Sequence, residues 1–325
     1  MPDIKTIGIY TSGGDCPGMN AAIRACVRIG ISKGLKMKGF IGGYHGLLNR
    51  DVCELQLKSV ANIIQRGGTF LKTGRCPEFL NASHRLRAQE SIKKENVDAL
   101  ICIGGDGSFM GAETLYNDFQ IPIVGIPATI DNDIYKVDKS IGYDTAVNTA
   151  LDAIDKIRDT AASHDRLFIV EVMGRNSGFI ATAVGIAGGA EEVFTAEAPA
   201  NIDQVIKHIK NSMNRGKQSS ILISAEGQKP GRAYDLAEQL RLKAGLEARV
   251  CILGHIQRGG SPLASDRILA SRYAEEAISM LLNGISGKYV AFNMGQFINV
   301  DLAESRLNKK HFPQEMIKLL RTLSI

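Results

Sequence analysis

The chain has 325 residues, of which 44% are hydrophobic and 22% charged, a composition ordinary for a globular enzyme and long enough for two domains. The formal net charge is only +5 and no long run of Lys or Arg occurs, which argues against a nucleic-acid surface but is compatible with phosphorylated, anionic ligands. The N-terminus lacks the pattern of a signal peptide, and no stretch of about 18 uninterrupted apolar residues predicts a membrane span.

Short apolar runs alternate with amphipathic stretches along the chain, as expected of βαβ units. The stretches 20–33 and 83–95 have the period of helices, and in the first Ile23, Cys26 and Val27 share one face. The alternation predicts an α/β fold with two Rossmann-like three-layer α/β/α domains, whose mostly parallel sheets face a central cleft. The predicted buried strands are 5–10, 99–105, 121–127, 167–174, 220–227 and 250–255.

The cysteines do not form a recognisable framework. None belongs to a C-x-x-C pair and several lie in apolar runs, so neither a zinc site nor a disulfide network is expected. Such usage is typical of a reducing cytosol. The six are Cys16, Cys26, Cys53, Cys76, Cys102 and Cys251.

Polar and glycine-rich segments follow the predicted strands. Ligands of open parallel sheets bind just beyond the carboxyl ends of the strands. We therefore expect the chemistry of the protein to reside in these segments. They are 11–18, 104–108, 128–133, 173–178, 226–232 and 255–262.

The segment "IGGDGS", after the second predicted strand, gives the sharpest phosphate signal. Gly104, Gly105 and Gly107 surround Asp106, which leaves room for a polyphosphate and offers a carboxylate oxygen to Mg²⁺. The alternative is a tight turn with a capping Asp. The segment 11–18 matches neither standard nucleotide motif, so a plain strand-to-helix turn and a phosphate cradle both stay open there.

Two carboxylates follow the strand 121–127, in "ATIDND". Asp131, nearer the strand end, is suited to take a proton from a substrate hydroxyl during phosphoryl transfer. For Asn132 and Asp133 a local turn in which the side chain bonds the backbone is favoured. Ala128 should have a negative φ, because alanine tolerates positive φ poorly.

Basic side chains gather in or beside the same segments. Arginine binds phosphate through bidentate, charge-assisted hydrogen bonds. Each residue alone is compatible with a plain surface position, whereas their repeated placement indicates a site for several phosphates. They are Arg75, Arg166, Arg175, Arg249, His255 and Arg258.

Taken together, these motifs resemble those of bacterial ATP-dependent 6-phosphofructokinases. The similarity runs from the first predicted strand to about Arg272 and weakens beyond it. It is carried by "TSGGDCPGMNAAIR", "RGGTFL", "GGDGSFMGA", "TIDNDI", "EVMGRNSG", "LGHIQRGGSP" and "DRILASR". The resemblance implies Mg²⁺-dependent transfer of the γ-phosphoryl of ATP to the 1-hydroxyl of fructose 6-phosphate, which gives fructose 1,6-bisphosphate and ADP in glycolysis.

The resemblance also implies roles for single residues. Asp131 resembles the general base, Thr129 a contact to the transferred phosphoryl, and Arg175 the cation that stabilises it, with Arg75 also counted as catalytic. Asp106 resembles the carboxylate linked to the metal. The residues that match ATP contacts are Gly14, Arg75, Cys76, Gly105, Asp106, Gly107 and Ser108. Those that match sugar-phosphate contacts are Thr129, Ile130, Asp131, Arg166, Met173, Gly174, Arg175, Glu226, Arg249, His255, Ile256, Gln257 and Arg258.

The family's assembly is implied as well. In it Arg166 and Arg249 reach the site of a neighbouring subunit, which implies a cytoplasmic homotetramer with shared active sites. The expected ATP-binding domain comprises 1–140 and 255–305, and the fructose-6-phosphate-binding domain comprises 141–254 and 306–325.

A regulatory site for ADP or phosphoenolpyruvate is also implied. Arg24 and Arg28, at i and i+4, share a helix face, although two solvent-facing arginines are the alternative. Leu57 stands where the family has an effector arginine, so we expect weakened or altered regulation. Phe179 stands where many relatives have an acid. The residues at effector positions are Arg24, Arg28, Lys58, Arg158, Gly189, Ala190, Glu191, Arg215, Lys217, Gln218 and Ser219.

Three rival functions share parts of the pattern. Pyrophosphate-dependent phosphofructokinases tend to have Asp at the position of Gly107 and Lys at that of Ala128, so ATP is favoured here. NAD and lipid kinases share "GGDG" but lack "HIQRGGSP". A non-catalytic sugar-phosphate sensor would have lost Asp106 or Asp131, and both are present.

Overall fold

The computed structural model describes residues 4–163, 166–217 and 219–324. The chain forms two compact units, which we describe separately. Unit 1 comprises Met1–Ile130, Ile134–Asp144 and Arg258–Lys310, and unit 2 comprises Asp131–Asp133, Thr145–Gln257 and His311–Ile325. The three residues of "DND" thus pack with unit 2, although the expected division placed them with the first domain. No helix in the described part of the chain is both long and apolar enough to cross a membrane.

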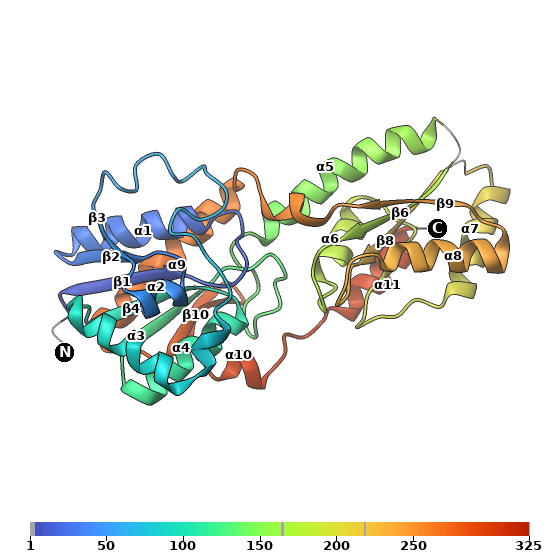
Figure 1. Cartoon of the computed structure of the whole chain (residues 1–325). Helices are drawn as coiled ribbons and strands as arrows, with labels where there is room; N and C mark the ends of the chain where they lie inside the picture. Colours follow the sequence, from blue (N-terminus) through green and yellow to red (C-terminus); the bar gives the residue numbers. More distant parts are fainter. Residues whose placement is uncertain (1–3, 164–165, 218, 325) are drawn as a thin grey trace. The chain divides into compact units, whose positions relative to one another are not determined.

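Unit 1 is built on a seven-stranded sheet in the order β11-β10-β5-β4-β1-β2-β3 (Figure 1). Its pairs are parallel except for β2–β3 and β10–β11. The strands are β1 (Thr6–Thr11), β2 (Lys36–Phe40), β3 (Val52–Leu55), β4 (Ala99–Gly104), β5 (Ile123–Pro127), β10 (Lys288–Asn293) and β11 (Gln296–Asp301).

Helices cover both faces of this sheet. Figure 1 shows α1 and α9 on one face and α3 and α4 on the other, and α1 packs along α9. The strands β1 and β4 are buried along their whole length, as their continuous apolar sequences predict. The helices are α1 (Met19–Ser32), α2 (Tyr44–Asn49), α3 (Ala82–Lys94), α4 (Asp106–Phe119), α9 (Ala264–Leu282) and α10 (Glu304–Leu307), with the 3₁₀ turn η1 (Pro77–Leu80).

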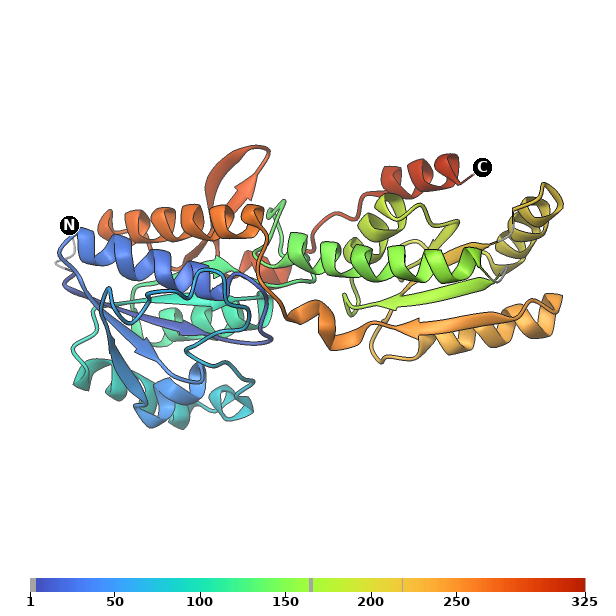
Figure 2. The same cartoon turned by 90° about the horizontal axis from the view of Figure 1, so that it is seen from above.

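Unit 2 is built on a four-stranded, fully parallel sheet in the order β7-β8-β6-β9. Helices α7 and α8 pack on one face, and α6 and α11 pack on the other (Figure 2). The strands are β6 (Leu167–Val172), β7 (Glu192–Phe194), β8 (Ser220–Ala225) and β9 (Ala248–Ile252). The helices are α5 (Tyr143–Ala162), α6 (Phe179–Ala187), α7 (Ile202–Asn214), α8 (Arg232–Ala244) and α11 (Gln314–Leu323), with the 3₁₀ turn η2 (Gly254–Arg258).

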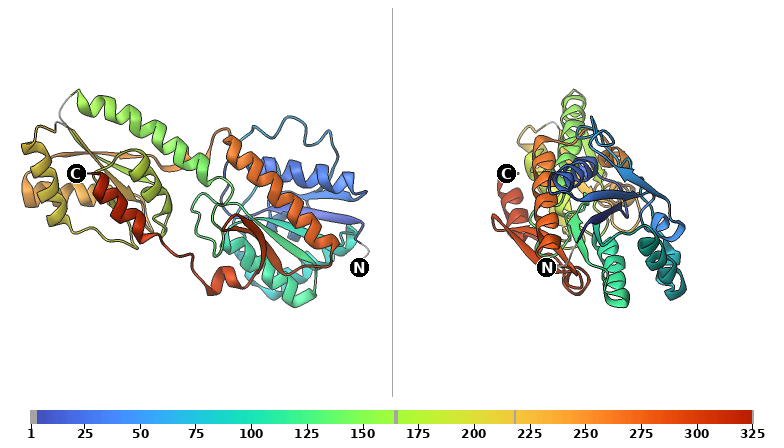
Figure 3. Two further views of the ribbon diagram at one scale, coloured as in Figure 1. Left: turned by 180° about the vertical axis from the view of Figure 1, so that it is seen from behind. Right: turned by 90° about the vertical axis from the view of Figure 1, so that its left-hand side faces the viewer.

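The predicted α/β class with mostly parallel sheets is confirmed, and each predicted strand is present. Both predicted helices form, and the face of α1 that carries Ile23, Cys26 and Val27 is buried. The left view of Figure 3 shows the helices of each unit from behind. The strands β2, β3, β7, β10 and β11 were not predicted.

One predicted burial was wrong. The run 250–255 was expected to be a buried strand, but β9 pairs only with β6 and lies at the edge of its sheet. Its side chains are half-buried or exposed, and Ile252 is 37% exposed. An apolar sequence predicts a strand, but it does not tell whether a second strand pairs with its outer edge.

Candidate functional site

In unit 1, three predicted loops lie at neighbouring strand ends. The order β5-β4-β1 brings together the segments that follow these strands. The backbone N–H of Ser12 donates to the carbonyl of Ile103 at 3.0 Å, which ties the first loop to the second. A Cβ on Gly104 would lie 2.5 Å from the hydroxyl oxygen of Ser108 and 2.7 Å from the carbonyl oxygen of Ser12. Glycine at this position therefore permits the loops to pack together.

The "GGDGS" segment is a helix start rather than an isolated turn. Gly105 is the N-cap of α4 and Asp106 is its first residue. The carboxylate of Asp106 accepts a 2.6 Å hydrogen bond from the backbone N–H of Gly107. Asp106 and Gly107 are exposed, and a Cβ on Gly107 would meet nothing within 4 Å. The helix dipole, the free space and the carboxylate suit a phosphate group with its cation.

The first loop also holds Arg258. Its guanidinium donates to the carbonyl of Asp15 at 3.0 Å, and a Cβ on Gly14 would lie 2.6 Å from the same guanidinium nitrogen. Gly14 thus permits the arginine to lie against the loop. Arg258 belongs to unit 1, whereas Arg166, Arg249 and His255, which also match sugar-phosphate contacts, belong to unit 2.

The backbone at the end of β5 has the predicted conformation at Ala128. Ala128 pairs with Ile141 and is not among the residues with positive φ, which confirms the expectation of a negative φ. The carbonyl of Thr129 accepts a 2.6 Å hydrogen bond from Ser140. Thr129 also lies beside the segment 104–108, since a Cβ on Gly105 would be 3.6 Å from the Thr129 Cβ.

In unit 2, Asp131 is buried and its backbone is anchored. Its exposed fraction is 6%, and its carbonyl accepts a 2.8 Å hydrogen bond from the hydroxyl of Ser177. Asn132 has a φ of 52°, the left-handed conformation that asparagine adopts in turns. This conformation is compatible with the turn predicted for Asn132, in which the side chain would bond the backbone.

The loop after β6 is strained and tied to the loop after β8. Arg175 has a φ of 51° and Gly174 a φ of 135°, and a Cβ on Gly174 would lie 2.5 Å from the carbonyl oxygen of Ser177. The N–H of Arg175 donates to the buried carboxylate of Glu226 at 3.2 Å. Non-glycine residues with positive φ persist where their surroundings fix them, often at functional sites. The arginine side chain is exposed.

Gln257 holds the same loop from another side. It is fully buried, its carbonyl oxygen accepts the N–H of Met173 at 2.8 Å, and its amide reaches the carbonyl of Ala146. The side chain predicted to contact substrate is thus occupied in positioning the loop. The neighbours His255 and Ile256 are exposed.

Within a single copy of unit 2, the predicted phosphate-binding residues Arg166 and Arg249 do not lie near Arg175. Arg166 precedes β6 and Arg249 lies near the start of β9, whereas Arg175 follows the end of β6. The register pairs Phe168 with Arg249, so Arg166 and Arg249 share the amino end of the sheet. A strand of six residues, such as β6, is about 20 Å long. One copy of unit 2 therefore does not offer these two arginines and Arg175 to one sugar phosphate.

Sequence comparison decides the family. The family model described as phosphofructokinase matches residues 6–281. The chain belongs to the phosphofructokinase family. The ATP-dependent 6-phosphofructokinase of Clostridioides difficile (strain 630) is 49% identical over 322 residues, which cover 99% of this phosphofructokinase and 100% of that protein.

Solved phosphofructokinases share the fold. The phosphofructokinase from Saccharomyces cerevisiae is 35% identical with a TM-score of 0.86 over 93% of this chain, which spans 45% of that longer chain. A pyrophosphate-dependent phosphofructokinase from Marinobacter aquaeolei is 22% identical with a TM-score of 0.84, over 96% of this chain and 86% of that one. The fold is thus shared with a phosphofructokinase that is described as pyrophosphate-dependent.

The predicted effector residues of this phosphofructokinase form separate groups. In unit 2, Lys217 lies 2.5 Å from the buried carboxylate of Glu191. Arg158 donates to the carbonyls of Gly188 and Gly189, next to Ala190. Arg215 contacts the hydroxyl of Ser212 at 3.3 Å.

The unit 1 group lies on α1 and after β3. Arg24 and Arg28 are half-buried and exposed, respectively, and Lys58 is exposed beside Leu57. Ser219 directly precedes β8 in unit 2, while Gln218 lies outside the described residues.

Two residues acquire roles that the sequence did not suggest. Phe179 is buried at the start of α6, and its ring lies 5.6 Å from that of Phe312. Glu171, buried within β6, accepts hydrogen bonds from the N–H groups of Gly231 and Ala233 at the start of α8. A single acidic residue inside an apolar strand indicates that its buried carboxylate has a hydrogen-bond partner, but the sequence pattern does not identify that partner.

Proposed function

We propose that this phosphofructokinase transfers the γ-phosphoryl of ATP to the 1-hydroxyl of fructose 6-phosphate, with Asp131 as general base. Near-full-length relatives at 47–49% identity carry the name ATP-dependent 6-phosphofructokinase. The structural observation that carries the choice of donor is the open space beside Gly107, at the first turn of α4.

Unit 1 provides the nucleotide side. The first-turn N–H groups of α4 and the loops at Gly14 and Gly105 would hold the phosphates, and Arg75 would add positive charge. Asp106 fits a magnesium ion, because one exposed carboxylate beside space for phosphate oxygens is the usual ligand set of this cation. When bound, the ion would neutralise phosphate charge and thereby assist the transfer.

Unit 2 provides the sugar side. The carboxylate of Asp131 would accept the proton of the 1-hydroxyl as its oxygen attacks the phosphoryl group, and Arg175 would stabilise the charge that is transferred. Glu226 accepts the backbone N–H of Arg175 and would also accept a hydrogen bond from a sugar hydroxyl. No covalent intermediate with the protein is required, because catalysis consists of positioning two anions and reducing their repulsion.

A second copy of the chain would complete the sugar site. Arg166 and Arg249 lie at the sheet end opposite Arg175, which supports a homotetramer whose subunits exchange these two arginines. Unit 1 would be the ATP-binding domain and unit 2 the fructose-6-phosphate-binding domain. The glycolytic reaction, and six cysteines that form no disulfide in the described part of the chain, are compatible with the cytoplasm.

Regulation by ADP or phosphoenolpyruvate would be weak or altered. Lys217 is already paired with Glu191, and Arg158 is bonded to two carbonyls. These contacts compete with an incoming phosphate. Leu57, 46% exposed, offers no charge where the family has an arginine.

A pyrophosphate-dependent enzyme is the rival on the same fold. An Asp at position 107 would repel the α-phosphate of ATP, and a Lys at position 128 would add charge for pyrophosphate. Gly107 and Ala128 do neither, and Ala128 is 1% exposed.

The experiment is a coupled assay of the purified full chain with fructose 6-phosphate, Mg²⁺ and either ATP or pyrophosphate. We expect fructose 1,6-bisphosphate with ATP and at least about a hundredfold lower kcat/KM with pyrophosphate, equivalent to about 2.7 kcal/mol. Equal or better use of pyrophosphate would overturn the choice of donor. No product with either donor would overturn the catalytic assignment itself.

A further inference from the structure

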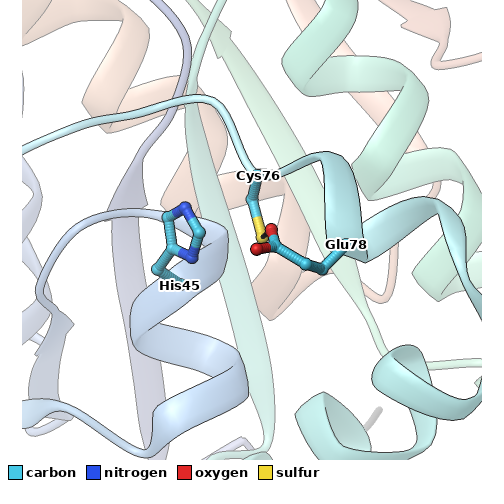
Figure 4. A group of neighbouring side chains, drawn as sticks. All are labelled: His45, Cys76 and Glu78. Atoms are coloured by element: carbon cyan, nitrogen blue, oxygen red, sulfur yellow. Dashed lines mark hydrogen bonds between the residues drawn. The ribbon is translucent and has the colours of Figure 1, made fainter.

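A histidine, a cysteine and a glutamate lie together at the segment of Arg75 and Cys76, two residues that match ATP contacts. Within the described residues, His45, Cys76 and Glu78 are a group whose potential ligand atoms all lie within 4.8 Å of one another. Figure 4 shows the His45 ring opposite the Cys76 thiol and the Glu78 carboxylate. None of the three has a role in the phosphoryl transfer apart from Cys76, which matches an ATP contact. All three belong to unit 1.

The hydrogen bond of His45 determines which ring nitrogen is available to bind a metal ion. Its Nε2 lies 3.0 Å from the backbone carbonyl of Arg75. A carbonyl oxygen only accepts, so Nε2 carries the proton and a neutral ring has its lone pair on Nδ1. Metal-binding histidines usually donate their second ring N–H to a carbonyl or carboxylate in this way. The contact is therefore what a metal-ligand histidine requires.

The backbone around the group is held by packing. His45 belongs to α2, while Cys76 and Glu78 belong to the start of η1. The buried rings of Tyr44 and Phe79, each adjacent in sequence to one ligand, lie 4.2 Å apart. This contact fixes the two elements to each other and so limits the rearrangement needed to bind an ion.

The spacing and the donor types suit a tetrahedral transition metal. Donors on a tetrahedral zinc ion lie about 3.5 Å apart, given zinc–ligand distances of about 2.0–2.3 Å. The Cys76 thiol already lies 3.5 Å from the Glu78 carboxylate. Thiolate and imidazole prefer zinc-like ions, whereas Mg²⁺ prefers oxygen. Three protein ligands leave a fourth position open, as in zinc sites that also bind water or an anion.

We propose that His45, Cys76 and Glu78 bind a zinc-class divalent ion, and that this ion hinders nucleotide binding beside Arg75. As the metal–sulfur bond forms, the thiol of Cys76 loses its proton to solvent, and Nδ1 of His45 and an oxygen of Glu78 supply the other two electron pairs. The ion removes Cys76 from the nucleotide contacts and fixes the Arg75 segment. The binding claim stands by itself, and only the inhibition claim rests on the proposed function.

Binding is tested on the full chain without substrates. Calorimetry with Zn²⁺ alone should give one site per chain in the presence of excess Mg²⁺, and Co²⁺ should give the near-ultraviolet charge-transfer band of a thiolate ligand. His45→Gln keeps a donor for the Arg75 carbonyl, and Cys76→Ser keeps the side-chain size. Each should weaken Zn²⁺ binding at least about tenfold, whereas His311→Gln, on exposed surface in unit 2, should not. Circular dichroism checks that each variant is folded.

The site is refuted if Zn²⁺ fails to bind, if both substitutions leave its affinity unchanged, or if Co²⁺ gives no thiolate band. The inhibition claim is tested by the KM for ATP. Zn²⁺ should raise this KM several-fold in the natural chain and should not alter it in His45→Gln. An unaltered KM in the natural chain would refute inhibition while leaving the site in place. An inactive chain that still binds Zn²⁺ would contradict the proposed function and not the metal site.

Discussion

The hydroxyl of Ser177 donates a 2.8 Å hydrogen bond to the backbone carbonyl of Asp131. Ser177 is buried and lies two residues beyond Arg175, so this bond joins the proposed base to the loop of the proposed cation. The replacement Ser177→Ala leaves the carbonyl without this donor, at a cost of about 1–3 kcal/mol. We expect a lower kcat with a small change in the KM for fructose 6-phosphate. In Ser163→Ala, which removes a similar bond at the exposed end of α5, kcat should stay normal.

Substitutions at Gly107 test whether the lack of a negative charge at this position favours ATP as the phosphoryl donor. Gly107→Asp should raise the KM for ATP at least about tenfold, because a second carboxylate beside Asp106 repels phosphate. Gly107→Ala is the matched control, since its Cβ meets nothing within 4 Å. Steady-state kinetics with varied ATP measures both. Equal effects of the two substitutions would mean that shape, not charge, controls this position.

Glu171 tests the capping of α8. Its buried carboxylate accepts two backbone N–H groups, each at 2.8 Å. Glu171→Gln removes the charge and should destabilise unit 2 by about 2 kcal/mol, because hydrogen bonds to charged groups at a helix start are strong. Urea unfolding followed by hydrogen exchange in α8 would measure it, since two units need not unfold together. Glu238→Gln, on the exposed side of the same helix, should leave the stability of unit 2 nearly unchanged, because exposed ion pairs contribute little.

Leu57 tests the proposed loss of regulation. Saturation curves for fructose 6-phosphate should shift little when phosphoenolpyruvate is added. Leu57→Arg should enlarge the shift, because it restores a cation for the effector phosphate. Leu86→Arg adds the same charge at another exposed leucine of unit 1 and serves as the control. A strong shift in the natural chain, reversed by ADP, would contradict the account.

The central strands could be predicted because burial on both faces makes them mostly apolar. The strands β1, β4, β6 and β8 are examples. The strand β2, "KMKGF", lies between β1 and β3 and alternates lysines with buried residues. The hairpin β10–β11 turns at Met294 and Gly295, both with positive φ. These weaker patterns depend on neighbours that lie far along the chain.

The site could be predicted as a set of loops, but not as a set of contacts. The motif identifies Arg175 and Glu226, yet not the backbone N–H that joins them. His45 carries no sequence signal, because its partners lie about thirty residues away on another element. Likewise Gln257 matched a substrate contact, and only the fold reveals its buried bond to Met173.

Asp131→Asn tests the central claim most directly, because it removes the proposed base with almost no change of shape. Steady-state kinetics with ATP should show a kcat at least about a hundredfold lower, with the KM for fructose 6-phosphate within a few-fold of its original value. Asp159→Asn, which removes one exposed negative charge from α5, should keep normal turnover. A kcat that Asp131→Asn leaves unchanged would contradict the assignment of Asp131 as the general base.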